Sequence, residues 1–230
     1  MNFAPHHNFT ACERLEKIVE ALRLANSITP AVYDDFSRYH FSLLHKLQSA
    51  RYHVETLTSY LASQNARQSD PHSVVYRVNF HFDGFLHVLG SALDILAREI
   101  LCCFAMLPQG NVHFHTASQV LTAARPNDTI LPLLASPPWR QEFSAYRNTA
   151  THESIVGRSY TVSIEVIGHK SVTRVVFPIP DDPRAVPVTC TRNQDIVKYC
   201  SATFKRVLSH TNQLYAHIEE RSRIGGTLPL

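Results

Sequence analysis

The sequence predicts a mainly α-helical chain with one β-hairpin inserted before its last helix. Apolar residues recur every three to four positions along most of the 230-residue chain, which is the spacing of helices with one buried face. Only residues 160–177 alternate apolar and polar side chains as strands do, on either side of a turn at 168–170. A chain of this length can bury a sizeable core, and we expect a single domain over residues 1–230.

Each expected helix has its own signals. Thr29 and Pro30 supply a cap and a first-turn proline for the second helix. The third is apolar around most of its circumference and should be the central, buried helix, in which Gly84 and Gly90 indicate close packing against a neighbour. A proline pair at 137–138 starts the fourth. The long helices are expected at residues 10–25, 30–62, 73–106, 139–153 and 193–223.

The remaining stretches read as connections. Residues 107–138 are expected to form short helical pieces and loops, with Thr116 or Ser118 as a cap. The hairpin is placed at about 158–178, and the proline-rich stretch after it leads to the C-terminal helix at about 193–223. Residues 225–230 should form a loose tail.

Composition and charge limit the classes of function. The net charge is +3, and no long run of Lys or Arg exists, so a nucleic acid would be bound locally rather than along a whole duplex. The 14 histidines make the chain more positive below pH about 6.5. Five cysteines without a CxxC pair favour a reducing compartment over disulfides or structural zinc.

Targeting signals are absent from the residues where they would be recognised. Residues 1–12 lack a basic region followed by an apolar run, so we expect no signal peptide. The longest apolar stretch, 95–107, contains Arg98 and Glu99 and is too short to span a bilayer. The expected location is cytoplasmic, with no membrane partner.

One stretch carries a set of groups suited to chemistry on RNA. Residues 147–152 read Arg-Asn-Thr-Ala-Thr-His, an RNxxxH pattern on an expected helix. The guanidinium of Arg147 can hold a phosphate bidentately and stabilise the charge that grows on it. The imidazole of His152 can take a proton from a ribose 2′-hydroxyl or give one to the leaving oxygen. The pattern therefore predicts metal-independent cleavage of a phosphodiester.

Helical geometry sets a condition on this chemistry. Asn148 and His152 are four residues apart and share a face, but Arg147 and His152 point about 140° apart around a regular helix. Either the helix is distorted there, or two copies of the chain meet so that each supplies what the other lacks.

The RNxxxH stretch resembles the motif of the HEPN superfamily, in which an Arg, often followed by Asn, precedes a His by a few residues. Arg147, Asn148 and His152 match these positions. The resemblance implies a helical bundle that forms a homodimer and cleaves single-stranded RNA at a composite site, without metal or cofactor. It also implies a toxin-antitoxin or defence setting, with an antitoxin protein as a partner. The resemblance is sharpest over about eight residues, and the hairpin is an elaboration found in only some members.

HEPN bundles often carry a polar or acidic residue on an earlier helix that faces the motif. Asp94 takes this place here and would pair with Arg147. Asp83, His87 and Ser91 precede it at spacings of four, four and three, which draws a polar line along one face of the third helix. Except for Asp94, internal pairing that sets helix register is the preferred interpretation of this line.

Other interpretations stay open. The RNxxxH stretch also fits a solvated helix end, with His152 close to the negative end of the helix dipole. The competing function is a non-catalytic, HEPN-like module that dimerises or binds a protein or nucleotide. The histidines at 6–7 and 113–115 are interpreted as loop residues rather than metal ligands, and Trp139 as a hydrophobic anchor rather than a base-stacking ring. Phosphate loops, GxSxG elbows and HExxH helices are absent from the sequence.

Overall fold

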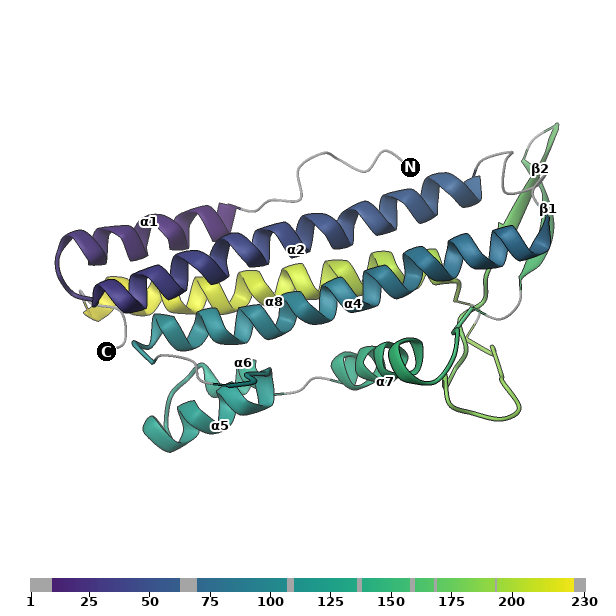
Figure 1. Cartoon of the computed structure of the whole chain (residues 1–230). Helices are drawn as coiled ribbons and strands as arrows, with labels where there is room; N and C mark the ends of the chain where they lie inside the picture. The colour runs from purple at the N-terminus through teal and green to yellow at the C-terminus, as the bar shows by residue number, and fades with distance from the viewer. Residues whose placement is uncertain are drawn as a thin grey trace. The chain divides into compact units, whose positions relative to one another are not determined.

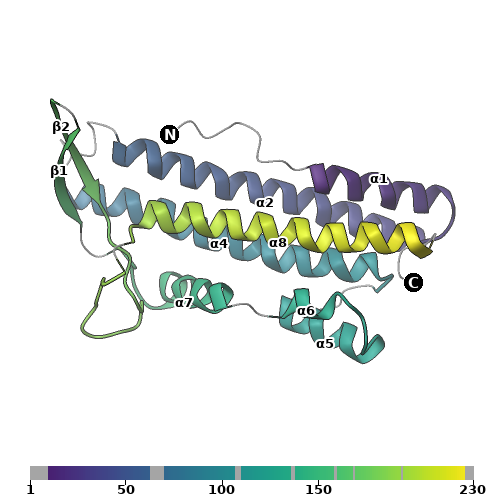
Figure 2. The same cartoon turned by 180° about the vertical axis from the view of Figure 1, so that it is seen from behind.

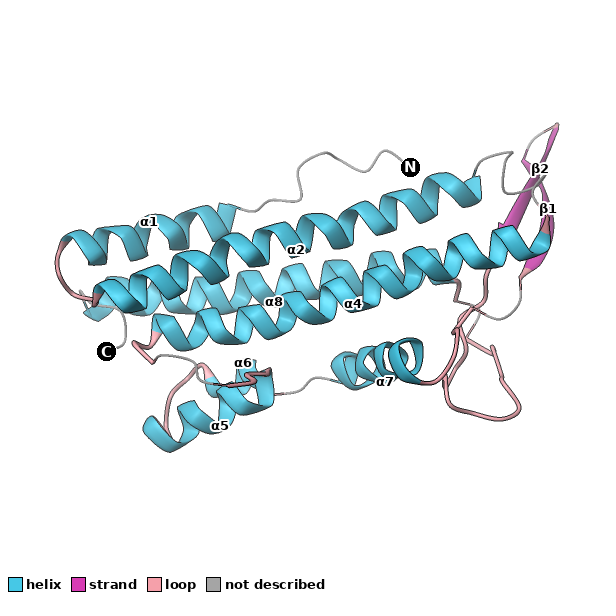
Figure 3. Ribbon diagram, viewed as in Figure 1, coloured by secondary structure: helices cyan, strands magenta, loops and turns pink. Residues whose placement is uncertain are grey.

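The protein is mainly helical, with one antiparallel hairpin before its C-terminal helix, as predicted. The computed structural model describes residues 10–62, 70–106, 110–135, 138–157, 160–167, 169–192 and 194–225. Strands in these ranges occur only in the hairpin, coloured magenta in Figure 3. The elements are α1 (Thr10–Leu24), α2 (Pro30–Ala62), α4 (Pro71–Cys103), α5 (Phe114–Ala124), α6 (Leu131–Leu134), α7 (Pro138–His152), β1 (Thr161–Ile167), β2 (Lys170–Val176) and α8 (Ile196–Gly225).

The chain divides into two compact units. Unit 1 comprises Met1–His45, Ala92–Ser136 and Arg206–Leu230, and unit 2 comprises Lys46–Ser91 and Pro137–Lys205. The helices α2, α4 and α8 each contribute residues to both units. The RNxxxH stretch lies in unit 2. The expectation of one domain over residues 1–230 stays a prediction.

Capping residues determine where the long helices begin. Thr29 accepts the backbone N–H of Val32 at 3.4 Å and starts α2, as expected. The third helix begins at Pro71 rather than Ser73, because Asp70 accepts the N–H of Ser73 at 3.0 Å. Likewise, the C-terminal helix begins at Ile196, since Asp195 accepts the N–H of Lys198 at 2.7 Å.

The prediction of a cap at Thr116 or Ser118 is wrong. Both residues lie inside α5, which begins at Phe114, and its N-cap residue His113 makes no side-chain capping bond. The helix starts there because its buried residues recur at helical spacing from its first position. The buried residues of α5 are Phe114, Ala117 and Leu121.

The hairpin pairs β1 with β2 in register from Thr161 opposite Val176 to Ile167 opposite Lys170. Lys170 is thus the first residue of β2 rather than part of the turn. After β2 the chain pairs with the approach to α8, because Ile196 donates its N–H to the carbonyl of Phe177 at 2.9 Å. Residues 158–159, 168 and 226–230, including most of the expected tail, lie outside the described residues.

In unit 1, α1 runs alongside the first part of α2 (Figure 1), as the view from behind also shows (Figure 2). Arg23 lies over the ring of Tyr33 at 4.9 Å and joins these two helices. Arg14 of α1 also forms an ion pair with Glu219 of α8 at 3.2 Å. Short helices α5 and α6 complete the unit.

A buried polar group joins three helices in the core of unit 1. Glu99 of α4 is fully buried, and His40 of α2 and Tyr215 of α8 are 3% and 1% exposed. His40 Nδ1 donates to Glu99 Oε1 at 2.7 Å, and the Tyr215 hydroxyl donates to Glu99 Oε2 at 2.7 Å. Both carboxylate oxygens therefore have a partner, as a buried charge requires.

No helix in the described ranges is long and apolar enough to cross a membrane. All five cysteines are free thiols, and four of them are buried. Burial raises the pKa of Cys12 and of Cys102 to about 12, so these thiols are protonated and behave as small apolar side chains.

Candidate functional site

The RNxxxH stretch occupies the second half of α7, whose inner face is set by three side chains at helical spacing. Phe143, Tyr146 and Thr149 are buried. Asn148 and His152 lie on the other side and are exposed, and His152 is the last residue of the helix. The predicted amide and imidazole are thus accessible to a ligand in the described structure.

Arg147 lies against α4 at Gly90. A Cβ atom built on Gly90 would come within 2.7 Å of Arg147 Nε and 2.8 Å of its Cδ and Cζ. The predicted close packing at Gly90 is therefore confirmed, and its partner is the motif arginine. A side chain at position 90 would displace the half-buried guanidinium, so glycine is needed to seat it.

Helix α7 keeps its α-helical form through His152. Within it, Thr151 Oγ1 donates to the carbonyl of Arg147 at 2.7 Å, a bond that a regular helix allows. Distortion of the helix therefore does not bring Arg147 and His152 together, and a meeting of two copies stays a prediction.

An amide on α4 holds the segment that follows α7. Asn79, 4% exposed, donates from Nδ2 to the carbonyl of Gly157 at 2.8 Å, and its Oδ1 accepts the Gly157 N–H at 2.9 Å. Both backbone groups of this buried glycine are therefore satisfied by one side chain. A Cβ on Gly157 would lie 2.9 Å from Ile196 Cδ1 and 3.2 Å from Asn79 Oδ1, so these side chains would have to shift to admit one.

Replacing Asn79 with alanine is expected to lower the free energy of unfolding by about 2–3 kcal/mol, because the N–H and C=O of Gly157 would stay buried without partners. Urea unfolding followed by circular dichroism measures the change. Gln213→Ala, at an exposed position of α8, is the control and should change stability by less than about 0.5 kcal/mol. Equal stability of the two variants would contradict the anchoring role of Asn79.

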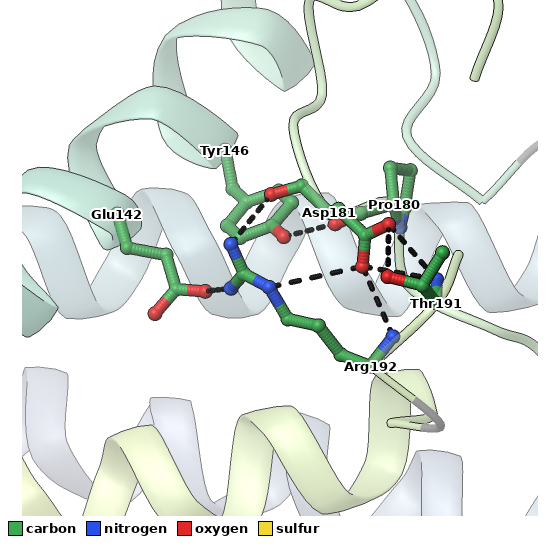
Figure 4. A network of polar contacts seen from close by, with 6 residues as sticks. All are labelled: Glu142, Tyr146, Pro180, Asp181, Thr191 and Arg192. Atoms are coloured by element: carbon green, nitrogen blue, oxygen red, sulfur yellow. Dashed lines mark hydrogen bonds and ion pairs between the residues drawn. The ribbon is translucent and has the colours of Figure 1, made fainter. Parts of the chain in front are cut away.

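The loop between β2 and α8 is tied to α7 by the polar network in Figure 4. Asp181 accepts the N–H of Thr191 at 2.8 Å and that of Arg192 at 3.1 Å, which folds the loop on itself. Arg192 also forms an ion pair with Glu142 of α7, and the Tyr146 hydroxyl donates to the carbonyl of Pro180. The backbone N–H of Thr191 is the largest cause that lowers the pKa of Asp181 to about 2, so its carboxylate stays charged.

The expected polar line on α4 divides into residues with different surroundings. Asp94 lies in unit 1, where it accepts a hydrogen bond from His113 Nδ1 at 2.7 Å; its pairing with Arg147 stays a prediction. His87 is exposed rather than buried in the helix face. Ser91 donates to the carbonyl of His87 at 3.0 Å, a bond within its own helix.

Asp83, the first residue of this line, lies in unit 2 and is partly buried. Its Oδ1 is buried and has no hydrogen-bond partner among the described residues. Burial raises the pKa of Asp83 to about 6. By helical periodicity Asp83 projects from α4 on the same side as Asn79 and Gly90, the two positions that contact α7 and the segment after it. A carboxyl group that titrates near neutral pH therefore lies on the side of α4 that holds the motif.

Asp83→Asn is expected to stabilise the protein at pH 7 by about 1–2 kcal/mol, because it removes a charge that burial disfavours. This value is smaller than the full pKa shift would give, since the side chain is partly open to solvent. The folded-state pKa lies above the ordinary value of 3.8, so the wild-type protein should lose stability as pH rises from about 4 to about 6. The variant should lack this slope, whereas Asp34→Asn, at an exposed carboxylate, should keep it. Thermal unfolding of the three proteins across pH 4–7 tests this, and parallel curves for wild type and Asp83→Asn would contradict it.

Metal ligation receives no support among the described residues, where no group of three or more His, Cys, Asp or Glu side chains is arranged to hold an ion. His113 pairs with Asp94, and His115 is exposed on α5 rather than in a loop. Trp139 is partly buried in the first turn of α7. Residues 6–7 lie outside the described residues.

A cluster of five rings in unit 2 was not predicted from the sequence. Tyr52 and His53 come from α2, and Tyr76, Phe80 and His81 come from α4. Tyr52, Tyr76 and Phe80 are exposed at 62%, 71% and 59%. Their spacing could have revealed them. Tyr76 and Phe80 are four residues apart and share a face of α4 that lies off its apolar stripe, so they are not expected in the core.

Comparisons with known proteins found no match for this chain among protein-family models, curated proteins or solved structures.

Proposed function

We propose that the protein is a metal-independent endoribonuclease of the HEPN type, which cleaves RNA through attack of the ribose 2′-hydroxyl on the adjacent phosphate. Arg147 stabilises the charge on the phosphate, His152 transfers a proton, and Asn148 orients the reacting groups. Asp94 takes part by orienting Arg147. The proposal includes a cytoplasmic setting with reduced thiols, and an antitoxin protein as a regulator.

The observation that carries the proposal is the seating of the motif on one regular helix. Arg147 packs against Gly90 and is held in place, while Asn148 and His152 are exposed on α7. A positioned cation, an accessible imidazole and an accessible amide are the groups that phosphodiester cleavage requires, and α7 carries all three. The resemblance of the six-residue stretch to the HEPN motif supplies the reaction.

A homodimer is part of the proposal. The regular helix keeps Arg147 and His152 of one chain about 140° apart around its axis. A twofold axis near α7 would bring the Arg147 of one chain toward the His152 of the other, because a symmetric interface juxtaposes the same surface twice. Each dimer would then hold two equivalent sites.

The test is cleavage of an end-labelled single-stranded RNA pool in EDTA by the wild-type protein and by the Arg147→Ala and His152→Ala variants. We expect products with 2′,3′-cyclic phosphate ends from the wild-type protein and at least a hundredfold slower cleavage by each variant. Arg206→Ala and His115→Ala remove an exposed arginine and an exposed histidine outside the motif and should cleave normally.

Two results would overturn the proposal. A folded, dimeric wild-type protein that leaves the RNA intact would favour the non-catalytic binding module. Cleavage that persists in both motif variants would assign the activity to other residues or to a contaminant.

A further inference from the structure

The five rings of unit 2 form a continuous group across two helices, which we name the aromatic platform: Tyr52, His53, Tyr76, Phe80 and His81. Tyr76 and Phe80 lie 6.4 Å apart between ring centroids with planes only 23° apart, and Phe80 meets His81 edge-on at 5.3 Å. Tyr52 of α2 meets the ring of His81 at 6.5 Å. The three large rings at its surface are exposed in the described structure.

A histidine pair holds the two helices of the platform together. Nδ1 of His53 and Nδ1 of His81 are 3.2 Å apart, so one imidazole donates to the other. Gly84 allows this approach, because a Cβ there would come within 2.5 Å of His53 Cε1. Burial and the nearby His81 lower the pKa of His53, and burial and Arg77 lower the pKa of His81, so both imidazoles are disfavoured in their charged form. The platform is therefore built on side chains with defined positions.

The chemistry of the platform favours nucleobases over an aliphatic protein surface. Its exposed apolar groups are all aromatic, and planar rings that are wet on one side are what single-stranded nucleic acids stack upon. Arg77 lies over the ring of Tyr60 at 5.6 Å, between the same two helices, and supplies a cation for a phosphate. Arg51 adds a second cation, although it bonds Glu55 at 2.7 Å.

The platform and the motif lie along one side of α4. Tyr76, Phe80 and His87 project from α4 in nearly the same direction by helical periodicity, and Gly90, which seats Arg147, lies about 40° to 80° away around the helix. Phe80 and Gly90 are about 15 Å apart along the helix axis. A single strand stacked on the platform could therefore reach Arg147 without leaving this side of unit 2.

We infer that the aromatic platform binds single-stranded RNA by base stacking and positions the strand for the motif on α7. This inference rests on the proposed function, because it takes its ligand class from it. Stacking on rings is tolerant of sequence, so the platform provides affinity without base preference.

A non-cleavable 2′-O-methyl RNA separates binding from cleavage, because it lacks the attacking hydroxyl. Binding of a fluorescently labelled, mixed-sequence strand of this RNA is measured by fluorescence anisotropy with the full chain. We expect the Tyr76→Ala/Phe80→Ala double variant to bind about tenfold to a hundredfold more weakly. Phe41→Ala removes a ring that is 75% exposed on α2 but outside the platform, and it should bind as wild type does. Tyr76→Phe/Phe80→Tyr keeps both rings and should also bind normally.

Three outcomes would overturn the inference. The first is unchanged binding by a folded double variant, and the second is the absence of binding by the wild-type protein. The third is a wild-type dimer that the double variant converts to a monomer in light scattering, which would make the platform an interface between copies. If the wild-type protein binds RNA through the platform but does not cleave it, only the proposed function would be overturned.

Discussion

Glu99→Ala is expected to lower the free energy of unfolding by about 3–5 kcal/mol, because it removes the acceptor that both His40 and Tyr215 share in the core of unit 1. The imidazole and the hydroxyl would stay buried without it, and a cavity would replace the carboxylate. Chemical denaturation at pH 6 followed by circular dichroism measures the loss. It is the largest effect on stability that we expect from one substitution.

Two variants make this result specific. Glu99→Gln keeps the size of the side chain and a hydrogen-bonding oxygen, so it should lose less stability than Glu99→Ala. Glu220→Ala removes an exposed carboxylate from α8 and should cost less than about 0.5 kcal/mol. A cost below about 1 kcal/mol for Glu99→Ala would show that the three-residue group does not hold unit 1 together.

The same group predicts how stability depends on pH. Burial alone would lower the pKa of His40, but the hydrogen bond and the charge of Glu99 raise it above 6.5. A raised folded-state pKa means that the contribution of the charged pair is fully present below pH about 6.5 and is lost as pH rises through the pKa of folded His40. The Glu99→Gln variant should lose this decline, which unfolding at a series of pH values would reveal.

Mixing the Arg147→Ala and His152→Ala chains is expected to restore RNA cleavage that neither variant has alone. If each site takes its arginine from one chain and its histidine from the other, a mixed dimer contains one site with both groups intact and one with neither. About half of the dimers are mixed after random exchange, so activity should recover to about a quarter of the wild-type value. Each variant alone should be at least a hundredfold slower than wild type.

The control is a mixture of Arg147→Ala with the Arg147→Ala/His152→Ala double variant, which has no intact arginine and should stay inactive. Mixed dimers that form but do not recover cleavage would mean that one chain supplies both groups, contrary to the geometry of a regular α7.

Helix positions could be predicted from the sequence because periodicity and caps are local. Thr29 and Pro30 marked the start of α2 correctly, and the start of α7 agreed with its proline. At α5 the prediction of a cap from residue type was wrong, because the burial of Phe114 outweighed the capping tendency of Thr116. Tertiary packing, which the sequence does not display, decided that helix start.

The site was predicted only in part for a related reason. Spacing identified Arg147, Asn148 and His152 and flagged close packing at Gly90, but it could not say that Arg147 is the partner there. The burial that raises the pKa of Asp83 and the contacts of His81 with Tyr52 and His53 of α2 depend on segments brought together by folding. His40 and Glu99 are 59 positions apart, so no local pattern relates them.

The contacts of α4 with Arg147 and with Gly157 set a length for the chain between them. Gly90 and Asn79 are about 16 Å apart along α4, and the ten-residue span from Arg147 to Gly157 must match that distance. Adding or deleting a single residue after His152 would release one of the two contacts, whereas the exposed side chains between His152 and Gly157 take part in neither contact. The stretch between His152 and Gly157 is therefore constrained in its number of residues more tightly than in its composition.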